Sequence, residues 1–196
     1  AQKQNTNAEV GDILKVPVHS DKFGRIATQN AKNVILQKIR EEERKVLFDQ
    51  YHGNEKEVVT GIVQRVVGHN VSVNLGKADA ILAENEQVKG ETFKPTERIK
   101  VYILEVKDTP KGPRILVSRT HPGLVKRLFE SEVAEVKDGT VEIKSIAREA
   151  GSRTKLAVWS NDPDVDPVGA CVGVNGARVS AIVNELRGEK IDIINW

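Results

Sequence analysis

The clearest structural signal in this sequence is DPVGACVGVNGARV, residues 166–179. Asp166 followed by Pro167 is typical of a helix N-cap with proline in the first helical position, so it predicts the start of a short helix. Gly173 and Gly176 then interrupt the chain before a second helical segment. A glycine pair between two helices is common, so its meaning depends on the elements around it.

The elements around this loop alternate in the order αββααβ. An amphipathic helix follows His121 and Pro122, two strands at about 140–149 and 153–159 form a hairpin, and a last strand spans 190–194. In this setting the glycines let a phosphate backbone approach the main chain, and free N–H groups at the start of the next helix face the anion. A KH module clamps about four nucleotides in this way.

Upstream of this region the hydrophobic period is two, and short β-rich runs are punctuated by turns. The strand candidates are 56–67, 70–75, 78–83, 98–107 and 114–119. Five strands in about 65 residues predict a small closed barrel of the OB type. A long helix with one apolar stripe is expected before the barrel, from about Arg25 to Tyr51, and a short strand-like run before that, from Ile13 to Val18.

The composition is that of an ordinary soluble globular protein. Lys and Arg number 30 against 28 Asp and Glu, so any nucleic-acid site must depend on local geometry rather than on a strong basic field. The single cysteine, Cys171, excludes an internal disulfide and a thiolate-rich zinc site. No apolar run approaches the roughly 18 residues that span a bilayer, and the start lacks a secretion signal. We expect a cytoplasmic protein without a membrane partner.

The sequence offers no catalytic constellation and no metal site. Its four histidines lie in separate segments, and no serine or cysteine has an obvious base partner. Asp162, Asp164 and Asp166 imitate the opening of a calcium loop, but Pro167 stands where a glycine is required and Gly173 where a glutamate is required. We therefore expect no enzyme activity, no metal and no cofactor.

Most of the chain resembles the NusA family of bacterial transcription elongation and termination factors. The family's first KH domain is similar to SIAREAGSRTKLAV (145–158), DPVGACVGVNGARV (166–179) and NELRGEKIDII (184–194). Its junction between barrel and KH domain resembles VSRTHPGLVKRLFESEVAEV (117–136), and the helix that enters its barrel resembles FGRIATQNAKNVILQKIREEER (23–44). These segments occur in the order that the family has.

The resemblance implies an α+β chain of three parts. Residues 1–54 would be the end of an N-terminal polymerase-binding domain with its linking helix. Residues 55–120 would be an OB-type barrel like the RNA-binding domain named for ribosomal protein S-one, and residues 121–196 a type II KH domain. The family's second KH domain would then be absent after Trp196.

The resemblance also implies a function and partners. Proteins of this family regulate pausing, termination and antitermination by holding nascent single-stranded RNA near RNA polymerase. The implied partners are RNA, RNA polymerase, contacted mainly through the truncated N-terminal domain, and other Nus factors. We expect a monomer.

The residues expected to contact RNA are Gly173, Val174, Asn175, Gly176, Ala177, Arg178, Arg148, Arg153, Lys155, His69 and Asn70. KH loops often carry a basic residue between the glycines, whereas this loop has Val174 and Asn175, so backbone N–H groups must bind the phosphates, with Arg178 as the nearest cation. Two positions that are often aromatic in such barrels are His69 and Ser72 here. Since base stacking is worth about 1–3 kcal/mol, we expect a weak barrel and a dominant KH surface.

Two other classes share these modules. An RNA-exosome cap subunit also places such a barrel before a KH domain, but it guides RNA to a ribonuclease. The long helix at 25–51 and the junction THPGLVKRLFE favour NusA. In phosphorolytic exoribonucleases the KH domain precedes the barrel, and their catalytic domains would not fit in this length.

Overall fold

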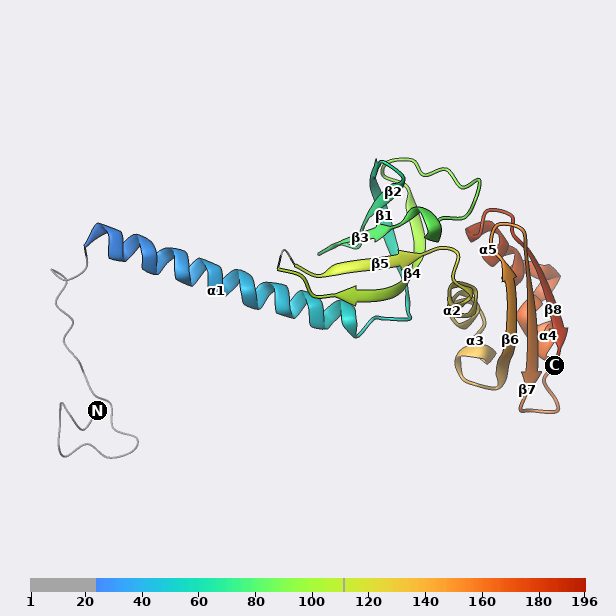
Figure 1. Ribbon diagram of the computed structural model, residues 1–196. Coiled ribbons are helices and arrows are strands. Elements are labelled where there is room, and N and C mark those ends of the chain that lie inside the picture. Colours follow the sequence, from blue (N-terminus) through green and yellow to red (C-terminus); the bar gives the residue numbers. More distant parts are fainter. Residues whose placement is uncertain (1–23, 111) are drawn as a thin grey trace, which may run out of the picture. The chain divides into compact units, whose positions relative to one another are not determined.

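The computed structural model describes residues 24–110 and 112–196 (Figure 1). The chain divides into two compact units, of which the first ends at Glu43 and the second begins at Arg44. The strand-like run expected from Ile13 to Val18 lies outside the described residues.

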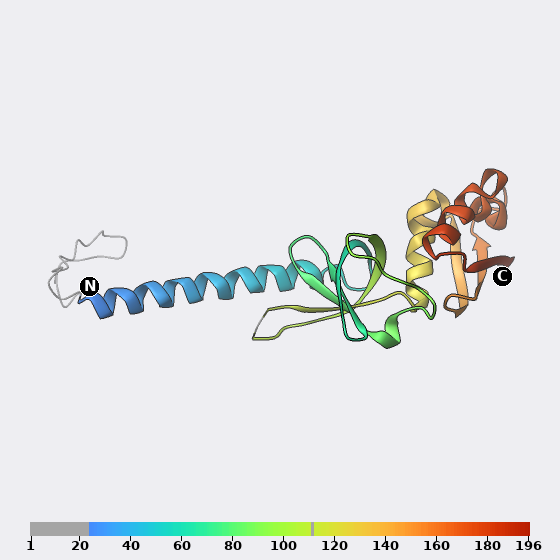
Figure 2. The same cartoon turned by 90° about the horizontal axis from the view of Figure 1, so that it is seen from above.

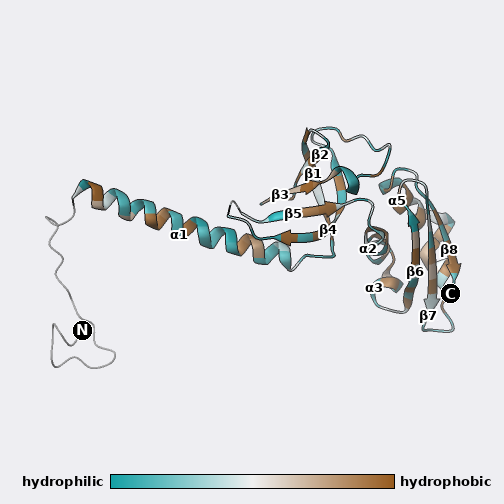
Figure 3. Cartoon of the chain, viewed as in Figure 1, coloured by the Kyte–Doolittle hydropathy of each residue, from teal (hydrophilic) through white to brown (hydrophobic). Residues whose placement is uncertain are grey.

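The expected long helix is α1 (Arg25–His52), which Figure 2 shows from above as one uninterrupted helix. Its apolar residues are spread among hydrophilic ones, as Figure 3 shows. The exposed ones are Ile26, Val34, Ile35, Leu36, Ile39 and Val46. Near its C-terminus Tyr51 is buried, and its hydroxyl donates a hydrogen bond to the Leu75 carbonyl at 3.1 Å. This end of the helix therefore packs against the barrel.

The five expected strands close into a barrel in the order β1-β2-β3-β5-β4. They are β1 (Val58–Val67), β2 (Asn70–Asn74), β3 (Asp79–Leu82), β4 (Arg98–Lys107) and β5 (Arg114–Ser118). Neighbouring strands are antiparallel except β3 and β5, which run parallel. Alternate residues fill the interior, as the pleat of a strand requires. The fully buried ones are Val63, Val73, Ala80, Leu82, Val101, Ile103, Ile115 and Val117.

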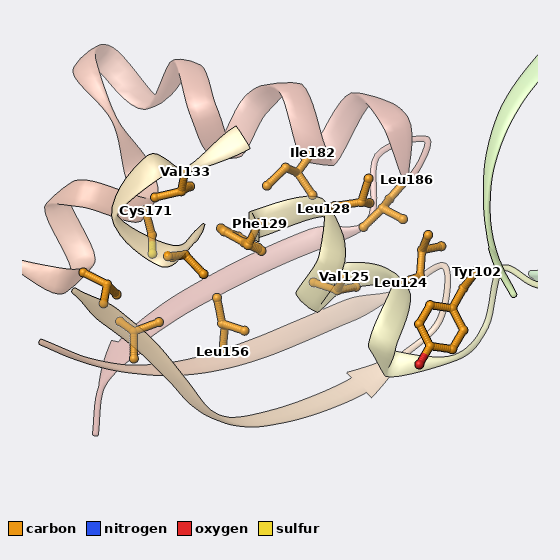
Figure 4. Packing of buried hydrophobic residues seen from close by; sticks show 13 residues of the cluster. Tyr102, Leu124, Val125, Leu128, Phe129, Val133, Leu156, Cys171, Ile182 and Leu186 are labelled. Carbon is orange, nitrogen blue, oxygen red and sulfur yellow. The ribbon is translucent and has the colours of Figure 1, made fainter. Parts of the chain in front are cut away.

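The second half has the expected αββααβ order, with one short helix added. Its elements are α2 (Pro122–Glu132), α3 (Ala134–Lys137), β6 (Val141–Glu149), β7 (Arg153–Ser160), α4 (Pro167–Val172), α5 (Ala177–Glu185) and β8 (Lys190–Asn195). The sheet order is β6-β7-β8, with β7 and β8 parallel. Figure 4 shows Phe129 and Ile182 of the helices meeting Leu156 of β7 in one core. The expected α+β class, with helix, OB-type barrel and KH domain, is confirmed.

A buried arginine joins the barrel to the KH domain. Arg119 follows β5, and only 1% of its side chain is exposed. It donates two hydrogen bonds to the Glu91 carboxylate, at 2.6 and 2.7 Å, and further ones to the carbonyls of Lys100 and Glu185. Burial lowers the pKa of Arg119, but the contacts with Glu91 and Glu185 more than offset this, so its pKa is raised and the guanidinium stays charged.

Two further contacts cross the same junction. Arg187, which follows α5, donates to Glu97 at 2.9 Å and stacks over the Phe93 ring at 5.3 Å. Gly151 faces Val88 so closely that an added Cβ would lie 2.4 Å from its Cγ1, and its φ of +81° also favours glycine. The barrel and the KH domain are therefore held together by side chains from both.

Replacing Arg119 with Met should destabilise the protein by about 3–5 kcal/mol, because the buried Glu91 carboxylate loses both hydrogen bonds from Arg119 and keeps only the more distant Arg187, at 3.9 Å. The matched control is Lys107→Met, since Lys107 pairs with Glu105 at 3.1 Å on the surface and such pairs contribute at most about 1 kcal/mol. Urea denaturation of both variants measures the difference. Equal losses of stability in the two variants would contradict a special role for Arg119.

Candidate nucleic-acid interface

Helix α4, which leads into the loop before α5, is held at both ends by specific contacts. The Asp166 side chain accepts a hydrogen bond from the Val168 N–H at 3.1 Å, which caps α4 as the sequence predicts. Cys171 lies fully buried and packs the helix into the core of the KH domain. At the other end of α4 the Gly173 N–H donates to the Gly169 carbonyl at 2.9 Å. The helix therefore delivers the chain to Gly173 in a fixed position.

The backbone of the loop turns outward through left-handed conformations. The φ angles of Gly173, Asn175 and Gly176 are 74°, 53° and 74°. Val174 between them is 83% exposed. Within residues 24–110 and 112–196, no hydrogen bond engages the backbone N–H groups of Val174 and Asn175. Successive free N–H groups in such a turn are a general arrangement for binding an anion.

Three of the basic residues expected to contact RNA, Arg148, Arg153 and Lys155, lie on the hairpin of β6 and β7. Arg148 on β6 has a fully buried side chain that donates two hydrogen bonds to the Glu189 carboxylate, at 2.8 and 2.9 Å. Arg153 and Lys155 of β7 are exposed, whereas Thr154 between them is buried, so they project from the face of the sheet opposite the core. The structure therefore does not bring these three residues together with the loop.

Arg178, in the first turn of α5, lies next to the loop, but its guanidinium already has partners. Its Nη1 donates to the Glu135 carboxylate at 2.9 Å and to the Ala170 carbonyl at 2.7 Å. The preceding Ala177 is exposed at the start of the same helix. Of the expected cations, Arg178 alone is near the glycines, and it is partly neutralised.

Of the expected barrel residues, His69 lies in the exposed turn between β1 and β2, and Asn70 is the first residue of β2. Nδ1 of His69 is 3.4 Å from the Glu84 carboxylate, and Oδ1 of Asn70 accepts a hydrogen bond from the Glu84 N–H at 3.2 Å. Gln87 donates to the His69 carbonyl at 2.7 Å. These contacts fix the turn against the segment that follows β3.

A groove of about 460 Å³ runs over β2 and β3 beside this turn. Arg65 and Arg114 contribute its cations, and neither forms an ion pair within the part of the chain that the structure describes. Its polar floor includes Ser72 and Asp79, which are linked through Gln64 by hydrogen bonds of 3.2 and 3.0 Å. The sequence interpretation missed both arginines, although this face and its loops are where OB folds bind oligonucleotides.

The chemistry of the remaining groups gives no sign of catalysis within the described residues. Burial, followed by the charge of Glu135, raises the pKa of Cys171 to about 11, so its thiol stays protonated at neutral pH. Residues 24–110 and 112–196 contain no cluster of three His, Cys, Asp or Glu side chains that could hold a metal ion. Over the same ranges no helix is long and apolar enough to cross a membrane.

Comparison with known families agrees with this geometry. Three family models match the chain: the NusA N-terminal domain over residues 1–45, the S1 RNA binding domain over residues 53–118, and the NusA-like first KH domain over residues 119–196. The barrel, the glycine loop and these matches define a multidomain RNA-binding protein of the S1 and KH class.

Curated relatives narrow the class to one family. The chain is 58% identical over 187 residues to the transcription termination/antitermination protein NusA of Bacillus subtilis, an alignment that covers 95% of this chain and 50% of that protein. The NusA proteins of Halalkalibacterium halodurans and Thermus thermophilus are 53% and 43% identical, with 98% and 100% of this chain and 50% and 51% of those proteins covered. The chain belongs to the NusA family, and it spans about half the length of these relatives.

The buried Glu189 carboxylate should make stability depend on acid pH. Burial raises its pKa, but hydrogen bonds from Arg148, Thr154 and the Gly151 N–H more than offset burial, so the folded-state pKa lies below the ordinary 4.5. A lowered folded pKa stabilises the protein above the unfolded value, and this contribution is lost as pH falls from about 4.5 through the folded pKa.

Urea denaturation of the wild type and Glu189→Gln between neutral and acid pH measures this linkage. The variant should be less stable at neutral pH, because it loses an ion pair with Arg148, and its stability should fall less steeply below about pH 4.5. Parallel pH profiles of the two proteins would show that Glu189 is not the titrating group.

Proposed function

We propose that this chain binds nascent single-stranded RNA near RNA polymerase and in this way regulates pausing, termination and antitermination. The domain order and the names of its relatives support this function. RNA polymerase and other Nus factors are the proposed protein partners. We assign polymerase contact mainly to residues 1–54, and RNA contact to the barrel, residues 55–120, and the KH domain, residues 121–196.

The observation that carries the RNA proposal is the outward turn at residues 173–176. Its two free backbone N–H groups, of Val174 and Asn175, stand on an exposed loop, and no side-chain carboxylate of the described residues is bound to them. A phosphate can accept both bonds, and the absence of Cβ atoms at Gly173 and Gly176 lets the nucleotide backbone come close. Binding here requires no catalytic step, only hydrogen bonds between the protein backbone of the loop and the phosphate backbone of the RNA.

The barrel groove is the second RNA site that we propose. Arg65 and Arg114 supply positive charge for phosphates, and Asn70 and Ser72 can bind base edges. None of the described residues that line the groove is aromatic, so these residues offer no stacking of the kind that strengthens many single-strand sites. We therefore assign it a smaller share of the affinity than the glycine loop.

We do not assign RNA contacts at the glycine loop to Arg148, Arg153 and Lys155, three basic residues of the hairpin of β6 and β7. Arg148 is left out of the contact surface, because its guanidinium is buried and bound to Glu189. Arg153 pairs with Asp192 of β8 at 2.6 Å, and Lys155 stands beside it on the outer face of the sheet. RNA held by the glycine loop would reach these two residues only by passing around the edge of the sheet.

Replacing Val174 and Asn175 together with Asp should weaken RNA binding by at least about tenfold, or 1.4 kcal/mol. The two carboxylates would face the phosphates, while an exposed loop contributes little to the core. Fluorescence anisotropy with a short labelled single-stranded RNA measures the affinity, and circular dichroism checks the fold. The control is Gln29→Asp with Asn33→Asp, which adds the same charge on the exposed surface of α1. Unchanged affinity in the folded loop variant would refute the loop as the RNA site.

The polymerase part of the proposal predicts that the chain crosslinks better to RNA emerging from a halted bacterial elongation complex than to the same RNA free in solution. Docking on the polymerase would raise the local concentration of the RNA site to as much as about millimolar. The RNA carries a photoreactive uridine near the exit channel, and the yield of crosslinked protein is measured for both RNAs. Equal yields would leave RNA binding intact but remove the role of the polymerase.

A further inference from the structure

Arg178 links the two helices on either side of the glycine loop. It stands in the first turn of α5, yet its Nη1 donates to the carbonyl of Ala170 in α4, at 2.7 Å. The same nitrogen donates to the carboxylate of Glu135 in α3, at 2.9 Å. One guanidinium therefore fixes three helices around the loop.

The Ala170 carbonyl is a natural acceptor for this contact. It belongs to the last turn of α4, where backbone carbonyls have no N–H partner within the helix. Helix α4 has only six residues, and a helix this short is not stable by itself. Arg178 supplies the missing donor and so stabilises the end of α4 that leads into Gly173.

The first glycine of the loop makes room for the arginine. A Cβ added to Gly173 would lie 2.7 Å from Cγ and 2.9 Å from Cδ of Arg178, closer than nonbonded atoms approach. The stem of Arg178 therefore runs directly against the Gly173 backbone. Gly173 is needed here for its φ of 74° and also for contact with this side chain.

We propose that Arg178 is a positioning residue that holds the loop N–H groups in their phosphate-binding arrangement and is not itself a phosphate ligand. The proposal rests on the RNA function proposed for the loop, and it assigns Arg178 a role other than the direct contact expected from the sequence. To bind a phosphate through Nη1, Arg178 would have to break its hydrogen bonds to the Glu135 carboxylate and the Ala170 carbonyl. It would then exchange one anionic partner for another and lose the bond to the carbonyl.

The variant that separates the two roles is Glu135→Gln, which keeps the charge of Arg178 and weakens its anchor. If Arg178 positions the loop, RNA affinity falls by several fold, because the arginine and the loop beside it become less ordered. A directly binding Arg178 would instead be released toward the phosphate, and affinity would stay or rise. The control is Glu142→Gln, which removes the same charge from an exposed pair with Lys144 on β6.

Salt dependence of binding gives a second and independent readout. About three phosphate contacts predict a log–log slope near −2 for single-stranded RNA, and each lost contact makes it shallower by about 0.7. Arg178→Gln should therefore bind less tightly with an unchanged slope if Arg178 only positions the loop.

All variants are measured by anisotropy with the same labelled RNA, and thermal unfolding is recorded beside each titration. Weaker binding of Glu135→Gln than of Glu142→Gln, together with an unchanged slope for Arg178→Gln, supports the proposal. A slope that becomes shallower by about 0.7, or Glu135→Gln affinity equal to or above that of the control, overturns it. If the loop variant Val174→Asp with Asn175→Asp binds normally, the RNA function of the loop fails first and this proposal with it.

Discussion

The ion pair between Arg119 and Glu91 is the contact on which the second unit depends. An arginine with 1% of its side chain exposed must satisfy its donors within the protein, and here the acceptors come from both domains. Burying two charges costs several kcal/mol of desolvation, so such a pair tolerates little movement. The contacts of Arg119 therefore join the KH domain to the barrel, and any movement between the two domains would have to break them.

Much of the fold could be predicted from the sequence because local patterns and structure agree. The alternation of period two in residues 56–119 and the N-cap with proline at Asp166 and Pro167 lie where the structure has strands and a helix start. The short helix α3 was missed, since four residues carry too little periodicity to be seen. The parallel pairing of β3 with β5 also has no local signal, because the two strands are joined only in the closed barrel.

The site was harder to predict, because the direction of a side chain depends on strand pairing and on ion pairs with residues far away in the sequence. In a regular strand Arg65 would share the inward face of Val63, but a bulge between these residues reverses the alternation and turns Arg65 into the groove. Arg148 was expected to contact RNA, yet its side chain is buried and paired with Glu189, 41 residues away. The glycines themselves were recognisable, since their place within the αββααβ order can be read along the sequence without tertiary information.

Cys171 can report how often the structure beside the glycine loop opens. It is the single thiol of the chain, it is fully buried, and it lies two residues before Gly173. A thiol reagent can reach its sulfur only when the packing around α4 opens, so the labelling rate reports local opening of the core beside the loop. Comparison of that rate with global unfolding would tell whether the loop opens by itself or only when the whole domain unfolds.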